Sequence, residues 1–164
     1  RLITHEGHTW TKMSDTDNAG DQAAIPGTGA MAGFLPKLLE AWNANDIDRV
    51  AAYHAPDYVG ENVAEASPQL GAEGLRRSLE SYFTAFPDLR FSADDLIVQG
   101  NRIVLAWTAR GTHRGSVMNI PATHRPIAVR GVVLFTIERE LIARALYVWD
   151  LAGLLRELGL LPDL

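Results

Sequence analysis

Cysteine is absent from this 164-residue chain, which excludes disulfide bonds, thiolate catalysis and zinc sites built from cysteine. Long apolar runs are also absent: no stretch reaches the roughly 18 residues of a membrane-spanning helix, and the first residues lack the apolar segment of a signal peptide. Positive charge is scarce, with 15 Lys and Arg against 20 Asp and Glu. Because nucleic-acid binding needs clustered positive charge, we expect a cytoplasmic protein that binds neither nucleic acid nor membrane.

The length and composition fit a single domain with its own core. A chain of 164 residues, 47% of them hydrophobic, can bury roughly 68–70% of its unfolded surface. Residues 1–30 differ from the rest, because residues 14–21 are polar and residues 26–29 are rich in turn formers. We interpret residues 1–30 as a flexible arm or leader, with Met13 as a candidate native start, and residues 31–164 as one domain.

Apolar residues recur at helical spacing in the first half of the chain. This spacing predicts one helix from residue 31 to residue 42, a second from residue 47 up to Pro56, and a third over residues 72–86. Asp46 is placed to cap the second helix, and Pro56 is expected to end it. Tyr58 and Val59 then predict a brief extended piece.

Near residue 90 the apolar period changes from helical to alternating. Four strands are predicted, at residues 90–99, 102–113, 127–139 and 141–150, and a short helix follows at residues 151–161. The turns at residues 100–101 and 139–140 are so short that the strands they join must pair antiparallel. Helices first and strands second predict an α+β domain, with three helices covering the concave side of an antiparallel sheet.

A succession of short motifs runs through the second half of the chain. They are Phe86-Pro87-Asp88-Leu89, Trp107-Thr108-Ala109-Arg110-Gly111-Thr112-His113, Ile120-Pro121-Ala122-Thr123-His124-Arg125, Val129-Arg130-Gly131 and Trp149-Asp150-Leu151-Ala152-Gly153. In this order and spacing the chain resembles the SnoaL-like polyketide cyclase family, within the nuclear transport factor 2-like superfamily. The resemblance covers roughly residues 31–161. It implies a cone-shaped fold, in which a curved sheet wraps around a helix and encloses an apolar cavity.

Asp150 is the first candidate for a catalytic role. In the family that this chain resembles, the acidic residue at the matching position is the general acid/base of an intramolecular aldol ring closure. Counting back by two along the strand places Asp150 on one face with Val148, Leu146 and Ile142, and desolvation on an apolar face suits a carboxyl group for proton transfer. Asp150 also directly precedes the last helix, where Asp is a preferred N-cap worth about 1 kcal/mol. Both roles stay open.

Several polar residues are further candidates for the same cavity. His113 and His124 flank a loop over the sheet, where either could assist proton transfer or hold a carbonyl oxygen, and a surface position is the alternative for each. Tyr58 and Asn62 are expected to donate hydrogen bonds to a polar substituent of the substrate. Arg130 could bind a substrate oxygen, with an outward salt bridge as its alternative.

Aromatic residues predict the walls of the cavity. A flat ligand fits between rings, which we expect from Phe83, Phe86, Trp107 and Trp149, although ordinary packing requires the same residues. No His, Asp or Glu spacing resembles a metal site, so we expect neither a metal nor another cofactor. Apolar residues occupy both the odd and the even positions of the predicted strands, so both faces of the sheet should be apolar. A second apolar face predicts a homodimer or a higher oligomer.

Three functions are compatible with these features. The first is a cofactor-free cyclase or isomerase that acts on a small hydrophobic, polyketide-like aromatic substrate, with Asp150 moving the proton. The second is a non-enzymatic binder of a small hydrophobic ligand, in which Asp150 only caps the helix. The third is an epoxide hydrolase-like enzyme, which is disfavoured because residues 106–109 lack the Arg-x-Asp pair of that family.

Overall fold

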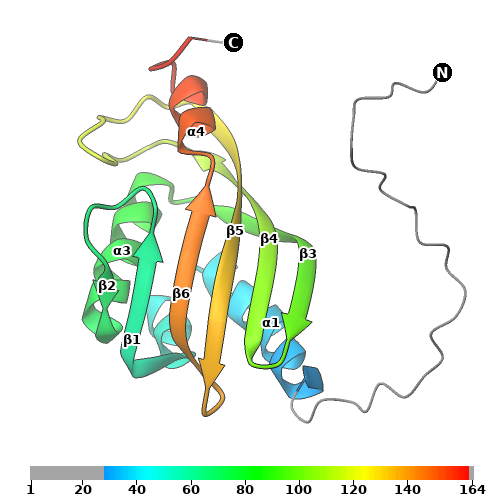
Figure 1. The fold of residues 1–164 in the computed structure, drawn as a ribbon. Coiled ribbons are helices and arrows are strands. Elements are labelled where there is room, and N and C mark those ends of the chain that lie inside the picture. Colours follow the sequence, from blue (N-terminus) through cyan, green and yellow to red (C-terminus); the bar gives the residue numbers. More distant parts are fainter. Residues whose placement is uncertain (1–27, 163–164) are drawn as a thin grey trace, which may run out of the picture.

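The computed structural model describes residues 28–162, which form four helices and six strands (Figure 1). The helices are α1 (Thr28–Asn43), α2 (Ile47–Ala52), α3 (Gly71–Ala85) and α4 (Leu151–Glu157). The strands are β1 (His54–Asn62), β2 (Gln69–Leu70), β3 (Arg90–Gln99), β4 (Arg102–Thr112), β5 (Pro126–Glu138) and β6 (Leu141–Trp149). Most of the arm predicted over residues 1–30 lies outside the described residues, while Thr28 already belongs to α1. The last helix is shorter than expected and ends at Glu157.

The six strands form one sheet in the order β2-β1-β6-β5-β4-β3. The four strands from β3 to β6 pair antiparallel with one another in chain order. The short turns predicted this for β3 with β4 and for β5 with β6, whereas β4 and β5 are joined by the longer loop of residues 113–125. One pair differs from that expectation, because β1 runs parallel to β6. No hairpin joins β1 to β6, so the short-connection rule that forces antiparallel pairing does not apply to them.

β1 is the element that the sequence described least well. It is a strand of nine residues, where only Tyr58 and Val59 were expected to be extended, and α2 ends at Ala52, before Pro56. Pro56 lies within β1, in the stretch between His54 and Val59 where the register with β6 shifts. Proline is tolerated at such an irregularity because no ladder hydrogen bond is needed from its missing N–H.

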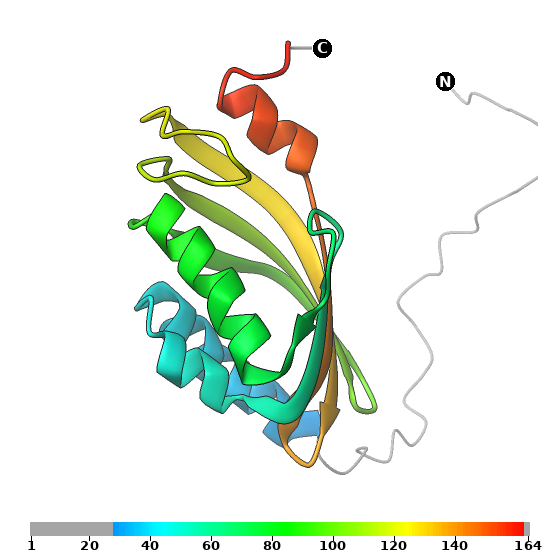
Figure 2. The same ribbon diagram turned by 90° about the vertical axis from the view of Figure 1, so that its left-hand side faces the viewer.

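The sheet curls toward the helices, and α1, α2 and α3 lie on its concave side (Figure 2). Leu75, Leu79 and Phe83 recur every fourth residue of α3, so one stripe of this helix is apolar and buried. The stripe belongs to a core that the sheet completes with side chains such as Ile103 and Val133. In the described residues, no helix has the length and apolar character needed to cross a membrane.

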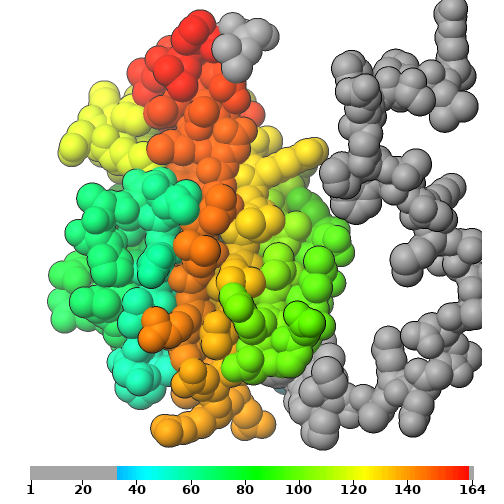
Figure 3. Space-filling view, viewed as in Figure 1, coloured from blue at the N-terminus to red at the C-terminus, as the bar shows by residue number. Residues whose placement is uncertain are grey.

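The opposite face of the sheet is left open by these helices, and Figure 3 looks onto it. Large apolar side chains are exposed there, with 59% of Ile97, 40% of Val132, 36% of Leu146 and 42% of Val148 accessible. Val132 pairs directly with Val148, and Leu146 pairs with Leu134, which lies two residues along β5 from Val132. We call Ile97, Val132, Leu146 and Val148 the outer apolar patch.

Candidate functional site

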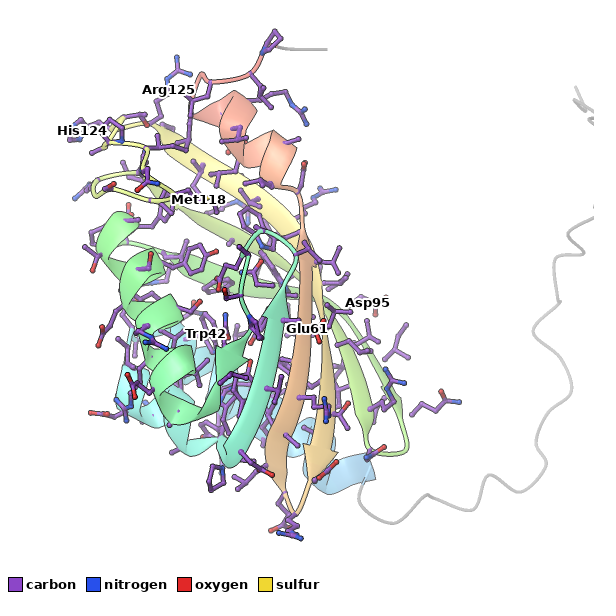
Figure 4. All side chains as sticks on the ribbon, turned by 60° about the vertical axis from the view of Figure 1, so that its left-hand side comes forward. Trp42, Glu61, Asp95, Met118, His124 and Arg125 are labelled. Carbon is purple, nitrogen blue, oxygen red and sulfur yellow. The ribbon has the colours of Figure 1, made fainter. Side chains whose placement is uncertain are left out.

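A cavity of about 130 Å³ lies between the helices α1 and α3 and the concave face of the sheet. Most of its wall is aliphatic or aromatic, and the lining side chains include Leu35, Leu38, Leu75, Leu79, Phe91, Leu105, Val129, Val133 and Phe135. Trp42 of α1 also lines it and lies between the helices and the sheet in Figure 4. A cavity of this size is comparable to one of about 150 Å³ that binds benzene in another protein.

Two tryptophans share one wall of the cavity because a glycine separates them. Gly131 of β5 pairs with Trp107 of β4 on one side and with Trp149 of β6 on the other. A Cβ atom at residue 131 would overlap the side chains of both tryptophans. The two tryptophan side chains can therefore occupy the space above β5 only because residue 131 has no side chain.

The polar end of the cavity is organised around the Glu65 carboxylate. Its Oε1 accepts hydrogen bonds from Asn62 Nδ2 at 2.9 Å, from Ser78 Oγ at 3.0 Å and from the Tyr82 hydroxyl at 3.3 Å. Asn62, Ser78 and Tyr82 all line the cavity. Among the described residues, Glu65 is the one carboxylate with hydrogen bonds to cavity-lining side chains.

Asn62 links this carboxylate to the tryptophan wall. Its Oδ1 accepts a hydrogen bond from Trp149 Nε1 at 2.8 Å and another from the backbone N–H of Ala64 at 3.0 Å. Its Nδ2 also donates to the Tyr82 hydroxyl at 3.2 Å. Both the oxygen and the nitrogen of the Asn62 amide are therefore hydrogen-bonded. Through these bonds Asn62 connects β6 with the loop that contains Glu65, although β6 and this loop are distant in the chain.

A second polar group adjoins the first through Gln69. Gln69 Nε2 donates to Ser78 Oγ at 2.8 Å, and the Tyr58 hydroxyl donates to Gln69 Oε1 at 3.3 Å. Tyr147 lines the cavity beside them, and its buried hydroxyl has no hydrogen-bond partner among the described residues. Burial raises the pKa of Tyr147 to about 12, and it also raises the pKa of Tyr58 and of Tyr82. These phenols are therefore neutral proton donors at physiological pH.

Asp150 lies outside the cavity wall. Its Oδ1 accepts a hydrogen bond from the backbone N–H of Gly153 at 2.7 Å, so Asp150 is the N-cap of α4. Its side chain is 54% exposed, and its Oδ2 lies 3.9 Å from Arg156 Nη2. Of the two roles weighed from the sequence, the geometry supports the cap, and the catalytic role of Asp150 stays a prediction.

Asp150 lies just beyond the alternation along β6. Tyr147 and Trp149 point to the concave side and line the cavity, so Leu146 and Val148 point to the other side. Asp150 follows the last residue of β6 and is exposed at the start of α4. The sequence grouped Asp150 with Val148, Leu146 and Ile142, but Ile142 is fully buried, beyond a shift in the register between β5 and β6. Leu146 and Val148 lie on the outer face, which is exposed.

His113 is buried. It lies neither on the protein surface nor in the wall of the cavity. Its side chain is fully inaccessible, and its ring is tilted against that of Phe86, with the centroids 5.2 Å apart. The backbone N–H of Thr123 donates to His113 Nδ1 at 3.2 Å, so the neutral ring carries its proton on Nε2. Burial lowers the pKa of His113. These contacts make His113 an anchor for the loop of residues 113–125, and Phe86 separates it from the cavity.

Three other predicted site residues also lie away from the cavity. His124 is exposed in the loop after β4, far from Trp42 in Figure 4. Arg130 is exposed on the outer face of β5, although none of the salt bridges among the described residues includes it. Phe83 is buried in the core, where its ring meets Trp42 edge-on with the centroids 5.9 Å apart.

Other predicted site residues do line the cavity. Asn62, Phe86, Trp107 and Trp149 do so directly. Tyr58 is fully buried and reaches the site through Gln69.

The residues that sequence reasoning missed are mostly polar and come from segments with weak patterns. Glu65 lies in the loop after β1, Gln69 in the two-residue strand β2, and Ser78 on the buried side of α3. A polar residue facing inward from an amphipathic helix, as Ser78 does, is the signal that could have been used. Among the described residues, no group of three or more His, Asp or Glu side chains is placed to hold a metal ion.

The fold and its apolar cavity define a small α+β protein of the nuclear transport factor 2-like class. The model of the SnoaL-like polyketide cyclase family matches residues 34–158. The chain therefore belongs to the SnoaL-like polyketide cyclase family, as its succession of motifs predicted.

Solved structures with this fold come from several bacteria. TsrD from Streptomyces laurentii is 32% identical, with a TM-score of 0.72 over 80% of this chain and 97% of that chain. A SnoaL-like polyketide cyclase from Agrobacterium tumefaciens is 23% identical, with a TM-score of 0.67 over 79% and 98%. AclR from Streptomyces galilaeus, described as a proposed hydroxylase, is 23% identical, with a TM-score of 0.74 over 83% and 89%. The last two likenesses show the fold alone. No match was found among curated proteins.

Proposed function

We propose that this protein is a cofactor-independent cyclase or isomerase, which removes a proton next to a carbonyl group of a small hydrophobic substrate. The observation that carries the proposal is the composition of the cavity: an apolar, aromatic wall with one polar end, at which a carboxylate is hydrogen-bonded to groups of the lining. Family membership supports this class of reaction. A carbonyl stabilises the carbanion that proton removal creates, so the reaction needs little beyond a placed base and a dry site.

The size of the cavity limits the part of the substrate that it buries. About 130 Å³ accommodates roughly one aromatic ring with a short substituent. Trp107 and Trp149 supply flat surfaces for such a ring, and Leu79 and Val133 supply aliphatic contacts. We therefore propose a single-ring or similarly small reacting unit, whatever the extent of the substrate outside the cavity.

Glu65 is the proposed proton acceptor. The Ser78 and Tyr82 hydroxyls line the cavity and donate to Glu65 Oε1, so each connects the substrate with the carboxylate. A hydroxyl that receives the substrate's C–H proton passes its own proton to Glu65 in the same step. The electron pair of the broken C–H bond becomes the carbanion, which the carbonyl delocalises. In an isomerisation the proton returns through the hydroxyl to a different carbon of this delocalised system. In an aldol closure the carbanion forms a C–C bond to a second carbonyl carbon of the substrate, whose C=O electron pair moves to oxygen, and the proton returns to that alkoxide oxygen.

Asp150 provides the competing proposal. The resemblance to polyketide cyclases assigns the general acid/base role to this position, whereas the hydrogen bond to Gly153 and the exposed position support a cap. The two carboxylates have different hydrogen-bond partners: side chains of the cavity lining for Glu65 and the backbone N–H of Gly153 for Asp150. Removing one charge at a time therefore separates the two assignments.

The experiment uses phenylacetone, a one-ring ketone with an activated CH2 group, as a substrate probe. In D2O the protein is expected to speed the exchange of these protons for deuterium, as measured by NMR. Glu65→Gln should lower the protein-catalysed exchange rate by about 10²–10⁴-fold, whereas Asp150→Asn should leave it nearly unchanged. Glu61→Gln is the matched control, because Glu61 is exposed on β1 (Figure 4).

Two results would contradict the proposal. Exchange that survives in Glu65→Gln and is lost in Asp150→Asn would return the proton transfer to Asp150. Binding of the probe without any acceleration of exchange would favour the second candidate function, a small-ligand binder. One observation favours that alternative: the Asn62, Ser78 and Tyr82 side chains already have hydrogen-bond partners in the protein.

A further inference from the structure

The side-chain amide of Asn62 has no hydrogen-bonding capacity left for a ligand. An amide oxygen can accept two hydrogen bonds, and an amide nitrogen can donate two. The Asn62 oxygen accepts one from Trp149 Nε1 and one from the backbone N–H of Ala64. Its nitrogen donates one to Glu65 Oε1 and one to the Tyr82 hydroxyl oxygen. The role of this buried amide must therefore lie in the groups that it holds.

The orientation of the Asn62 amide is fixed by two groups that can only donate. The indole nitrogen of Trp149 and the backbone nitrogen of Ala64 each carry one proton and offer no acceptor. They lie 2.8 Å and 3.0 Å from the Asn62 oxygen, so a flipped amide would set N–H against N–H at both contacts. The amide nitrogen must therefore face Glu65 and Tyr82.

The direction of the Tyr82 hydroxyl follows from that orientation. Its oxygen accepts a proton of the Asn62 amide at 3.2 Å, so its own proton must point elsewhere. Glu65 Oε1, which as a carboxylate oxygen can only accept, lies 3.3 Å away. The main chain adds a second restraint, because the backbone N–H of Glu65 donates to the Asn62 carbonyl oxygen at 2.9 Å.

We propose that Asn62 is a positioning residue, whose amide holds the Glu65 carboxylate beside Tyr82 and keeps the Tyr82 proton directed at it. This inference rests on the proposed function in taking Glu65 as the proton acceptor. In that reaction Tyr82 can receive a substrate proton only while its own proton is free to move to Glu65. A donor at residue 62 keeps the hydroxyl in this productive direction.

An isosteric substitution separates this role from packing. Asn62→Asp keeps the shape and leaves an oxygen for Trp149 and Ala64, but it removes both donated protons. Phenylacetone should bind with nearly the same dissociation constant, because Asn62 offers it no polar group. The exchange rate at saturating phenylacetone should fall about 10²-fold, as expected when a reacting group is misplaced by about 1 Å. An unchanged exchange rate would show that Asn62 only packs against its neighbours, and it would overturn the inference.

Asn45→Asp is the matched control. Asn45 lies between α1 and α2, outside the cavity wall, and its Nδ2 donates to the Pro87 carbonyl oxygen at 2.9 Å. The variant loses that bond, so it should have a lower Tm but the exchange rate of the wild type. A similar fall of the exchange rate in Asn45→Asp and Asn62→Asp would reduce the effect to general destabilisation and overturn the inference.

Urea unfolding of the ligand-free protein tests the contact without any substrate. Asn62→Asp should lower the free energy of unfolding, because it sets two carboxylates side by side. Adding Glu65→Gln should recover most of that loss, because the new side-chain amide can donate to the new carboxylate. Additive losses, or a double variant that does not fold, would overturn the inference. A wild-type protein that exchanges no probe protons would instead sink the proposed function, and the inference would stand or fall on the coupling between residues 62 and 65.

Discussion

Both faces of the sheet carry apolar side chains, but the two faces differ in the polar groups that accompany them. On the concave face, Asn62, Tyr147 and Trp149 interrupt the apolar surface, and α1 and α3 enclose them with it. On the outer face, exposed charged residues such as Glu61 and Asp95 border the apolar patch (Figure 4), while α4 packs against β5 at one end of the sheet (Figure 1). Enclosed polar groups suit a small ligand, whereas an open apolar patch with charged surroundings suits another protein surface.

The largest expected effect concerns the outer face. We propose that a second copy of this chain covers the outer apolar patch, so Val148→Lys should convert a dimer into a monomer. Each lysine would be buried without a partner in the interface, which costs roughly 3–5 kcal/mol per charge. Sedimentation at tens of micromolar protein measures the change, with Glu80→Lys, at an exposed position of α3 on the other side of the sheet (Figure 2), as the charge control. A wild-type protein that sediments as a monomer would contradict the proposal that a second copy covers the outer apolar patch.

Acid should lower the free energy of unfolding through His54, which is buried. Burial lowers the pKa of His54 to about 4, from 6.5 in the unfolded chain. Between pH 6.5 and pH 4 the unfolded chain binds a proton that the folded chain does not, so the free energy of unfolding falls as the pH falls. The loss is on the order of 3 kcal/mol once the pH reaches about 4.

Urea unfolding at pH 7 and pH 5, on the wild type and on His54→Gln, measures this effect. The variant should have lower stability at pH 7, because the hydrogen bond between the ring and the Val50 carbonyl is lost, and a weaker dependence on pH. The same slope in both proteins would assign the acid sensitivity to other groups.

Two neighbouring valines of β5 compare the faces directly. Val133 is 2% exposed on the concave side, whereas Val132 is 40% exposed on the outer side. Val133→Ala should cost about 2 kcal/mol in the free energy of unfolding, because it leaves a void in the core. Val132→Ala should cost less than about 0.5 kcal/mol in the monomer. If the cost of Val132→Ala grows with protein concentration, the outer face is an interface between copies.

The smallest expected effect tests the cap. Asp150→Ala should cost about 1 kcal/mol, because the backbone N–H of Gly153 loses its acceptor, while Asp150→Asn should cost only a few tenths. Chemical denaturation measures both values. Equal costs for the two variants would mean that the charge near Arg156, not the cap, is what stabilises this end of the sheet.

The sequence predicted the architecture well because periodicity reports it. The change of period near residue 90 located β3 to β6, and the two-residue turns set their pairing. Alternation placed Leu146 and Val148 on one face, but a register shift near Ile142 breaks the pattern, and both faces of β6 are apolar. Periodicity states which residues share a face; it does not state which face the helices cover.

The candidate site was less predictable because it depends on contacts between distant segments. Trp149 and Asn62 are 87 residues apart in the chain, and their hydrogen bond exists only because β1 lies beside β6. That parallel pair has no turn signal in the sequence. Glu65 enters the site from a loop, where neither helical nor strand spacing applies, so no local pattern marks it.

The position of β1 in the sheet also has a consequence for how the chain folds. Its strand partners are the two-residue β2 and the distant β6, with Gly60 opposite Ala145. During synthesis on a ribosome, β1 emerges long before its main partner β6. The backbone of β1 therefore stays unpaired on that side while β3, β4 and β5 can already pair with one another. High contact order of this kind slows folding and prolongs the exposure of unpaired backbone. We expect the β3–β6 meander to acquire protection from hydrogen exchange first and β1 to join in the final, rate-limiting step.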